Sequence, residues 1–143
     1  MFQSPILYIL APIILACITN FIIFRYKWNK QKINPYLPPG YIIGIVWIII
    51  FGFLGYTFYL LLNKNKKFTI GLLALILMLI FCLLYPFFTQ GFNNEYISRF
   101  LNILTFIFSI IVGLIVFSEY KSAFLYIIPL ILWSLYVNVS DLL

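Results

Sequence analysis

The stretch "IGLLALILMLIFCLLYPFF", Ile70 to Phe88, carries no charged residue along its whole length. A helix of about 20 residues crosses the roughly 30 Å hydrocarbon core of a bilayer, so this stretch is long enough to span one. A membrane β-strand would be shorter and would alternate polar with apolar residues. A helix also satisfies its backbone hydrogen-bonding groups internally, as lipid requires. The stretch therefore predicts a transmembrane helix.

Similar apolar runs fill most of the chain on both sides of this stretch. Of the 143 residues, 65% are hydrophobic and 8% are charged. A soluble domain of this size cannot bury so much apolar surface. The predicted spans cover residues 4–24, 41–62, 68–89, 98–118 and 123–142. The sequence therefore predicts an all-α integral membrane protein, a five-transmembrane-helix bundle that forms a single domain over residues 1–143.

The charged residues all lie in loops or at the ends of the predicted spans. Basic residues crowd the first two loops, which contain Arg25, Lys27, Lys30 and Lys32, and then Lys64, Lys66 and Lys67. We interpret these clusters as headgroup contacts and topology signals rather than as a nucleic-acid site. Lysine and arginine divide almost equally between the two sides of the membrane, so this count leaves the orientation open. The position of the first loop beside the first helix favours a cytoplasmic first loop.

The sequence contains no pattern that is typical of a catalytic or metal site. It has no histidine, the commonest metal ligand and the usual general base at neutral pH. The carboxylates Glu95, Glu119 and Asp141 are far apart in sequence, and no phosphate-binding glycine loop is present. No predicted span carries a charge near its centre, which argues against a proton-coupled transporter. We therefore expect no catalytic residues, no metal and no obligatory cofactor.

Aromatic and small residues form separate stripes on the second predicted span. The aromatic stripe has spacing i, i+4, i+7 and i+11 and consists of Trp47, Phe51, Leu54 and Phe58. The other stripe consists of Gly44, Gly52 and Gly55. Small residues allow close helix approach in lipid, so these glycines are expected to pack against another helix. Pro38 and Pro39 suit the start of a helix, where a missing N–H costs nothing.

The last predicted span has an aromatic and polar face. Its members are Trp133, Tyr136, Val137 and Ser140, and Pro129 lies one turn before Trp133. A proline inside a span invites a kink. Two tryptophans with such neighbours, Trp47 and Trp133, suit the walls of a pocket for a flat apolar ligand. Ordinary helix packing explains the same residues, so the two interpretations stay open at this point.

Two motifs resemble those of a known family, the TspO/MBR family of translocator proteins, once called peripheral benzodiazepine receptors. The stretch "PPGYIIGIVWIIIFGFLGYTFY" resembles the family's second-helix signature, in which the matching residues are Pro38, Pro39, Gly44, Val46, Trp47, Gly55 and Tyr59. The stretch "PLILWSLYVNVSD" resembles the fifth-helix pattern through Pro129, Trp133 and Tyr136. There, Val137 replaces a small residue and Asp141 takes the place of an asparagine. The third span keeps only Phe87 and Phe88 of its family pattern.

The resemblance implies a five-helix bundle, often dimeric, with a pocket that opens near the first loop. Family members bind tetrapyrroles such as protoporphyrin IX or haem precursors, and synthetic isoquinoline and benzodiazepine ligands; some bind cholesterol. Carried over by position, the ligand-binding residues are Trp28, Trp47, Phe51, Leu83, Phe87, Trp133, Tyr136 and Val137. The junction between the first loop and the second helix is Pro38, Pro39 and Gly40. From their placement, we expect the basic residues of the first loop to meet porphyrin carboxylates.

The resemblance also implies partners and a location. The expected partners are the lipid bilayer, a tetrapyrrole or other apolar small molecule, and a second copy in a homodimer, with no nucleic acid. The membrane would be the cell membrane of a bacterium or the mitochondrial outer membrane of a eukaryote. Alternative functions on the same fold are a small transporter or exporter of an apolar metabolite and a structural membrane partner. Light-dependent porphyrin breakdown, reported for some members, is a further possibility because both pocket tryptophans are present.

Overall fold

The computed structural model describes residues 4–25, 36, 40–92 and 95–142, and in this part of the chain it contains helices and no strand. The elements are α1 (Pro5–Arg25), α2 (Gly40–Asn65), α3 (Ile70–Phe92), α4 (Glu95–Glu119), the 3₁₀ helix η1 (Lys121–Tyr126) and α5 (Ile128–Leu142). The five segments long and apolar enough to cross a membrane are Pro5–Ile23, Ile42–Asn65, Ile70–Phe88, Glu95–Glu119 and Lys121–Leu142. The predicted five-helix bundle is confirmed, and the chain is a multi-pass integral membrane protein.

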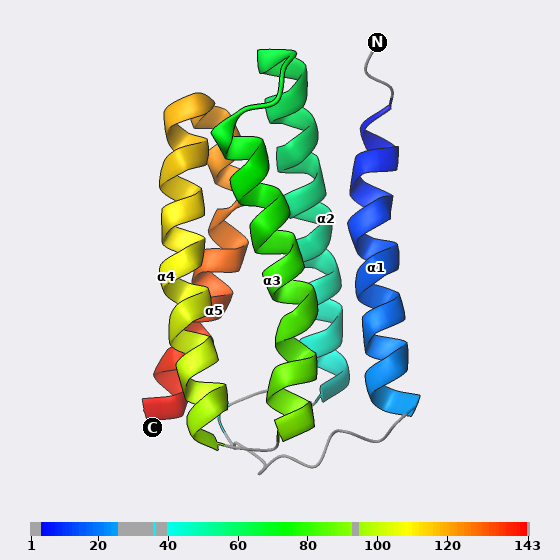
Figure 1. Ribbon diagram of the computed structural model, residues 1–143, viewed down its shortest axis with the longest axis vertical. Coiled ribbons are helices and arrows are strands. Elements are labelled where there is room, and N and C mark those ends of the chain that lie inside the picture. The colour runs from blue at the N-terminus through cyan, green and yellow to red at the C-terminus, as the bar shows by residue number, and fades with distance from the viewer. Residues whose placement is uncertain (1–3, 26–35, 37–39, 93–94, 143) are drawn as a thin grey trace.

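The helices stand side by side along the long axis of the molecule (Figure 1). Helices α1 and α2 pack together at one edge, α4 packs against α5 at the other, and α3 contacts α1, α2 and α4. We call the end at which α1 ends and α2 begins the first-loop end. Helix α5 also ends there, whereas the turn from α2 to α3 lies at the opposite end (Figure 1).

The glycine stripe of α2 packs against α1, as the sequence predicted. A Cβ added to Gly55 would overlap the carbonyl oxygen of Tyr8 and lie 3.0 Å from Cγ of Pro12. Pro12 has no N–H to donate to that carbonyl, which lies four residues earlier in α1. Gly52 faces Ile13 in the same way, with an added Cβ 3.2 Å from its Cδ1. Close approach of these helices therefore depends on the absence of side chains from α2.

The interior of the bundle is apolar and closely packed. Its fully buried side chains come from α2, α3, α4 and α5 and from the residue between η1 and α5, and they include Leu61, Leu72, Met78, Val112, Val116, Ile127 and Leu130. Hydroxyl groups in the interior donate to the carbonyl one turn earlier in their own helix. Thr57 donates to Phe53 at 2.9 Å, and Thr105 donates to Leu101 at 2.7 Å. These bonds let a polar side chain lie in the core without an unsatisfied hydrogen.

The fifth span is built from two kinds of helix. The 3₁₀ helix η1 ends at Tyr126, and α5 starts at Ile128, so Pro129 lies in the first turn of α5. A proline there loses no intrahelical bond, because the first N–H groups of a helix have no partner within it. The sequence predicted a kink at Pro129 within one span; the structure instead changes helix type just before it.

Candidate functional site

The predicted residues of α2 lie at the inner surface of that helix. Phe51 is only 3% exposed and belongs to the buried core. The Trp47 ring is half-buried, with its centroid 6.0 Å from the Phe51 ring and 6.1 Å from the ring of Tyr85 on α3. Trp47 therefore joins an aromatic cluster between α2 and α3, together with Phe51 and Tyr85.

A groove of about 310 Å³ lies between α2 and α5. Its walls contain two predicted residues from α5, Trp133 and Tyr136, whose ring centroids are 5.6 Å apart. The other lining residues, none of them predicted for the site, are Val46, Ile49, Ile50, Pro129 and Leu132. The groove is thus walled by hydrocarbon and aromatic surface, and it lies within the spanning segments of both helices.

The hydroxyl of Tyr136 links this groove to the end of the first loop. It donates a hydrogen bond to the backbone carbonyl of Tyr36. Both side chains are exposed, so the contact lies at the surface of the bundle. A wall of the groove is therefore joined to a segment that precedes α2, at the end where the sequence predicted the pocket to open.

The structure brings the predicted residues together in two groups rather than one. Trp133 and Tyr136 line the groove, whereas Trp47 and Phe51 lie in the aromatic cluster beside it. Val46, which lines the groove, directly precedes Trp47 in sequence. Both tryptophans pack against the same buried core. That Trp47 and Trp133 face one ligand from opposite sides stays a prediction.

The remaining predicted residues fall on other parts of the bundle. Leu83 is half-buried on α3 and packs against the core, and Phe87 is half-buried one turn later on the same helix. Val137 is half-buried on α5, next to Tyr136. Helix α2 begins at Gly40. Six predicted residues lie outside the described part of the chain: Trp28, Pro38 and Pro39, and the first-loop lysines Lys27, Lys30 and Lys32.

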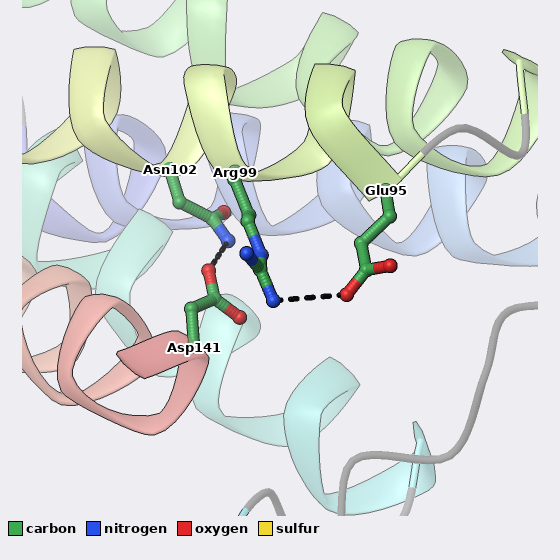
Figure 2. Close-up of polar contacts among 4 residues, drawn as sticks. All are labelled: Glu95, Arg99, Asn102 and Asp141. Atoms are coloured by element: carbon green, nitrogen blue, oxygen red, sulfur yellow. Dashed lines mark hydrogen bonds and ion pairs between the residues drawn. The ribbon is translucent and has the colours of Figure 1, made fainter. Parts of the chain in front are cut away.

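A line of polar side chains, which we call the polar seam, joins α3, α4 and α5. The Tyr85 hydroxyl donates to Oδ1 of Asn102, and Nδ2 of Asn102 donates to Oδ2 of Asp141 at 2.6 Å. Figure 2 shows Asn102 on α4 and Asp141 on α5 pointing toward each other. Asn138 Nδ2 donates to the backbone carbonyl of Asn102 at 2.9 Å and to that of Ser134 at 2.7 Å. Asn102 is only 7% exposed, so these bonds satisfy a buried amide.

The polar seam starts at the first-loop end and stops inside the bundle. Its inner end is the pair Ser109 and Ser134, whose hydroxyl oxygens are 3.4 Å apart. Beyond Ser109, the next buried residues of α4 are Val112, Gly113 and Val116. Among the described residues, the seam therefore provides no continuous polar path from one end to the other.

Analysis of the sequence missed the polar seam, although a signal for it was present. Asn102, Thr105 and Ser109 recur at i, i+3 and i+7 on one helix. Ser134, Asn138 and Asp141 recur at i, i+4 and i+7 on another. Polar residues that share one face of an apolar span indicate contact with another helix, because lipid does not satisfy them.

A second polar cluster closes the opposite end of the bundle. The Glu119 carboxylate at the end of α4 accepts hydrogen bonds from the Gly71 N–H and, at 3.3 Å, from Nδ2 of Asn65. Lys64 Nζ donates to the Glu119 backbone carbonyl at 3.1 Å and lies 4.4 Å from the ring centroid of Tyr120. Because Gly71 is in the first turn of α3, Glu119 also meets the positive end of that helix dipole. This cluster ties the α2–α3 turn to the end of α4.

The only salt bridge among the described residues lies at the surface. Arg99 and Glu95 are one turn apart on α4, with 3.0 Å between their charged atoms, and both are exposed. Figure 2 draws this ion pair together with the hydrogen bond from Asn102 to Asp141. Within the same part of the chain, no three histidine, cysteine, aspartate or glutamate side chains gather into a metal site.

The sequence profile of the TspO/MBR family matches residues 8–141. No curated protein is similar enough to the chain to count as a match. The family match spans all five helices and includes the aromatic cluster, the groove and the polar seam.

Proposed function

The chain belongs to the TspO/MBR family, and from this premise we propose that it is a membrane receptor or sensor for tetrapyrroles. The ligands would be protoporphyrin IX, haem precursors and related flat apolar molecules bound between the helices. The groove between α2 and α5 carries this proposal, because Trp133 and Tyr136 offer aromatic surface there within an apolar wall. Flat conjugated rings stack on such aromatic surfaces, which favours their transfer from water or lipid into the groove.

The size of the groove limits how a tetrapyrrole enters. Its volume of about 310 Å³ is at the lower end of the roughly 300–1,000 Å³ typical of ligand pockets. A tetrapyrrole therefore requires the groove to widen, and on α2 the widened groove would reach the Trp47 ring, which follows the lining residue Val46 in sequence. Breaking the Tyr136–Tyr36 hydrogen bond would free one wall for this movement. Exposed Arg25, at the end of α1, supplies positive charge at the first-loop end for ligand carboxylates.

Titration of the purified protein in lipid nanodiscs with protoporphyrin IX tests this function. We expect saturable quenching of tryptophan fluorescence and a higher thermal midpoint, because a ligand selective for the folded state stabilises it. Trp133→Ala and Trp47→Ala should each weaken binding about tenfold or more, since each removes an aromatic contact surface. The matched control is Phe100→Ala, which removes an exposed ring on α4, away from the groove. Quenching no greater than in empty nanodiscs, or equal affinity in all variants, would contradict the proposal.

A second candidate function is export or transfer of an apolar metabolite. The groove favours it because its rim contains exposed Ile49 and Leu132, so an apolar molecule can enter sideways from the bilayer. Proteoliposomes loaded with protoporphyrin IX distinguish the two functions. Protein-dependent efflux that is lost in Trp133→Ala supports transport, whereas saturable binding without efflux supports a receptor.

A further inference from the structure

Asp141 differs from the other carboxylates because its charge lies within the polar seam. Its side chain is half-buried at the end of α5, and its Oδ2 accepts a hydrogen bond from Asn102 at 2.6 Å. Arg99, three residues before Asn102 on α4, forms its ion pair with Glu95 (Figure 2). No ion pair to Asp141 is found among the described residues. The seam thus holds a negative charge that hydrogen bonds, rather than an opposite charge, stabilise.

A chain of two hydrogen bonds connects the Asp141 carboxylate to the aromatic cluster. Tyr85 donates to Asn102, and Asn102 donates to Asp141, so both hydrogens point toward the carboxylate. Aligned bonds of this kind polarise one another, which makes the Tyr85 oxygen more negative. The Tyr85 ring lies 6.1 Å from the Trp47 ring. The charge at the end of α5 is therefore linked to the place where the groove would widen.

The distance to the groove is short enough for the charge to act on a ligand. Asp141 and Trp133 are eight residues apart on α5, which corresponds to a rise of about 12 Å along the helix. At that separation and an effective dielectric constant of about 20, one unit charge changes the Kd of a singly charged ligand about tenfold. Salt screens this half-buried charge less than it screens a fully exposed one.

We propose that Asp141 is a specificity-determining residue, which makes the site favour flat apolar ligands that are neutral or positively charged over anionic ones. The inference rests on the proposed function and names the ligand class of that same site. A tetrapyrrole whose carboxylates are esterified, or one that carries a cationic group, fits this class. A dicarboxylate tetrapyrrole binds with its carboxylates toward Arg25 at the end of α1 rather than toward Asp141 at the end of α5.

Two porphyrins of the same ring but different charge provide the test. Protoporphyrin IX is an anion at neutral pH, and its dimethyl ester is neutral. In Asp141→Asn, the amide oxygen still accepts the bond from Asn102, while the charge is removed. We expect this variant to bind protoporphyrin IX about tenfold or more tightly than the native protein does, and the ester with a Kd within about twofold. Asp141→Ser, a smaller neutral residue, should shift the ratio of the two Kd values in the same direction.

Glu119→Gln is the matched control, because it removes one negative charge at the opposite end of the bundle. It should leave the ratio of the two Kd values unchanged. Saturable binding of both porphyrins with the same ratio in native, Asp141→Asn and Asp141→Ser proteins would overturn this inference alone. An equal change of ratio in Glu119→Gln would also overturn it, because net charge would then explain the effect. If the native protein binds neither porphyrin, both this inference and the proposed function are wrong.

Discussion

The two ends of the bundle each contain a buried or half-buried cluster around one carboxylate, and the two carboxylates are held in different ways. Glu119 accepts from a helix N-terminus and an amide, and a lysine binds its backbone carbonyl. Among the described residues, Asp141 accepts one hydrogen bond, from the side-chain amide of Asn102. The positive end of a helix dipole offsets the negative charge of a carboxylate such as Glu119, and their hydrogen bonds stabilise the fold. The negative charge of a carboxylate with uncharged hydrogen-bond partners, such as Asp141, is not offset in this way, so it can interact electrostatically with a nearby ligand.

Gly71→Ala should destabilise the polar cluster around Glu119 more than any other substitution considered below. An added Cβ would lie 2.5 Å from Oε2 of Glu119, so the carboxylate must leave the N-terminus of α3. We expect the free energy of unfolding to fall by about 3 kcal/mol, from overpacking and the loss of a charged hydrogen bond. Reversible unfolding in mixed detergent micelles measures this change.

The matched control for that substitution is Gly52→Ala. Its added Cβ would approach only the flexible end of the Ile13 side chain, at 3.2 Å. The cost should be below about 1 kcal/mol, since that side chain can move aside. If both alanine variants lose the same stability, contact of the Glu119 carboxylate with the start of α3 does not contribute specifically to the stability of the fold.

Glu119→Gln should have an intermediate effect. The glutamine can still accept one hydrogen bond, but the charge that interacts with the start of α3 is lost. We expect a loss of about 1–2 kcal/mol in the free energy of unfolding. The control Glu95→Gln breaks an exposed ion pair and should cost less than about 0.5 kcal/mol. If Glu95→Gln lowered the free energy of unfolding more than Glu119→Gln does, burial of the carboxylate would not explain how much each one stabilises the fold.

Tyr85→Phe should have a smaller effect on stability than Gly71→Ala or Glu119→Gln, and it tests the hydrogen bonds at the Asp141 end. It removes the donor to Oδ1 of Asn102, which should cost about 1 kcal/mol. It also removes one of the two aligned bonds that connect Asp141 to the Trp47 cluster, so the emission maximum of Trp47 should shift. Tyr136→Phe removes a hydroxyl in an exposed contact, and we expect a loss below about 0.5 kcal/mol. Unchanged Trp47 emission in Tyr85→Phe would mean that the seam does not influence the cluster.

Much of the fold could be predicted because lipid imposes simple rules on sequence. Continuous apolar runs such as Ile70–Phe88 predict spanning helices, and the structure confirms all five. The glycines of α2 predicted close packing, which occurs against Tyr8 and Pro12 of α1. The 3₁₀ segment before Pro129 was not predictable in the same way, because hydropathy does not distinguish one helix type from another.

The candidate site was less predictable because it depends on which helices meet. Stripe analysis placed Trp47 and Trp133 on faces of their own helices but did not show that Ile49 and Leu132 share a groove. The polar seam was missed because its residues are single interruptions in apolar spans. Only the packing of α4 against α5 shows that Asn102 and Asp141 are partners.

Equilibrium binding of protoporphyrin IX in lipid nanodiscs tests the central claim most directly, since the claim is that the aromatic surfaces at α2 and α5 hold a flat ligand. The account predicts one saturable site in the native protein, weakened about tenfold or more in Trp133→Ala and unchanged in Phe100→Ala. Binding that only follows the amount of lipid, or that is equal in the two variants, would contradict it.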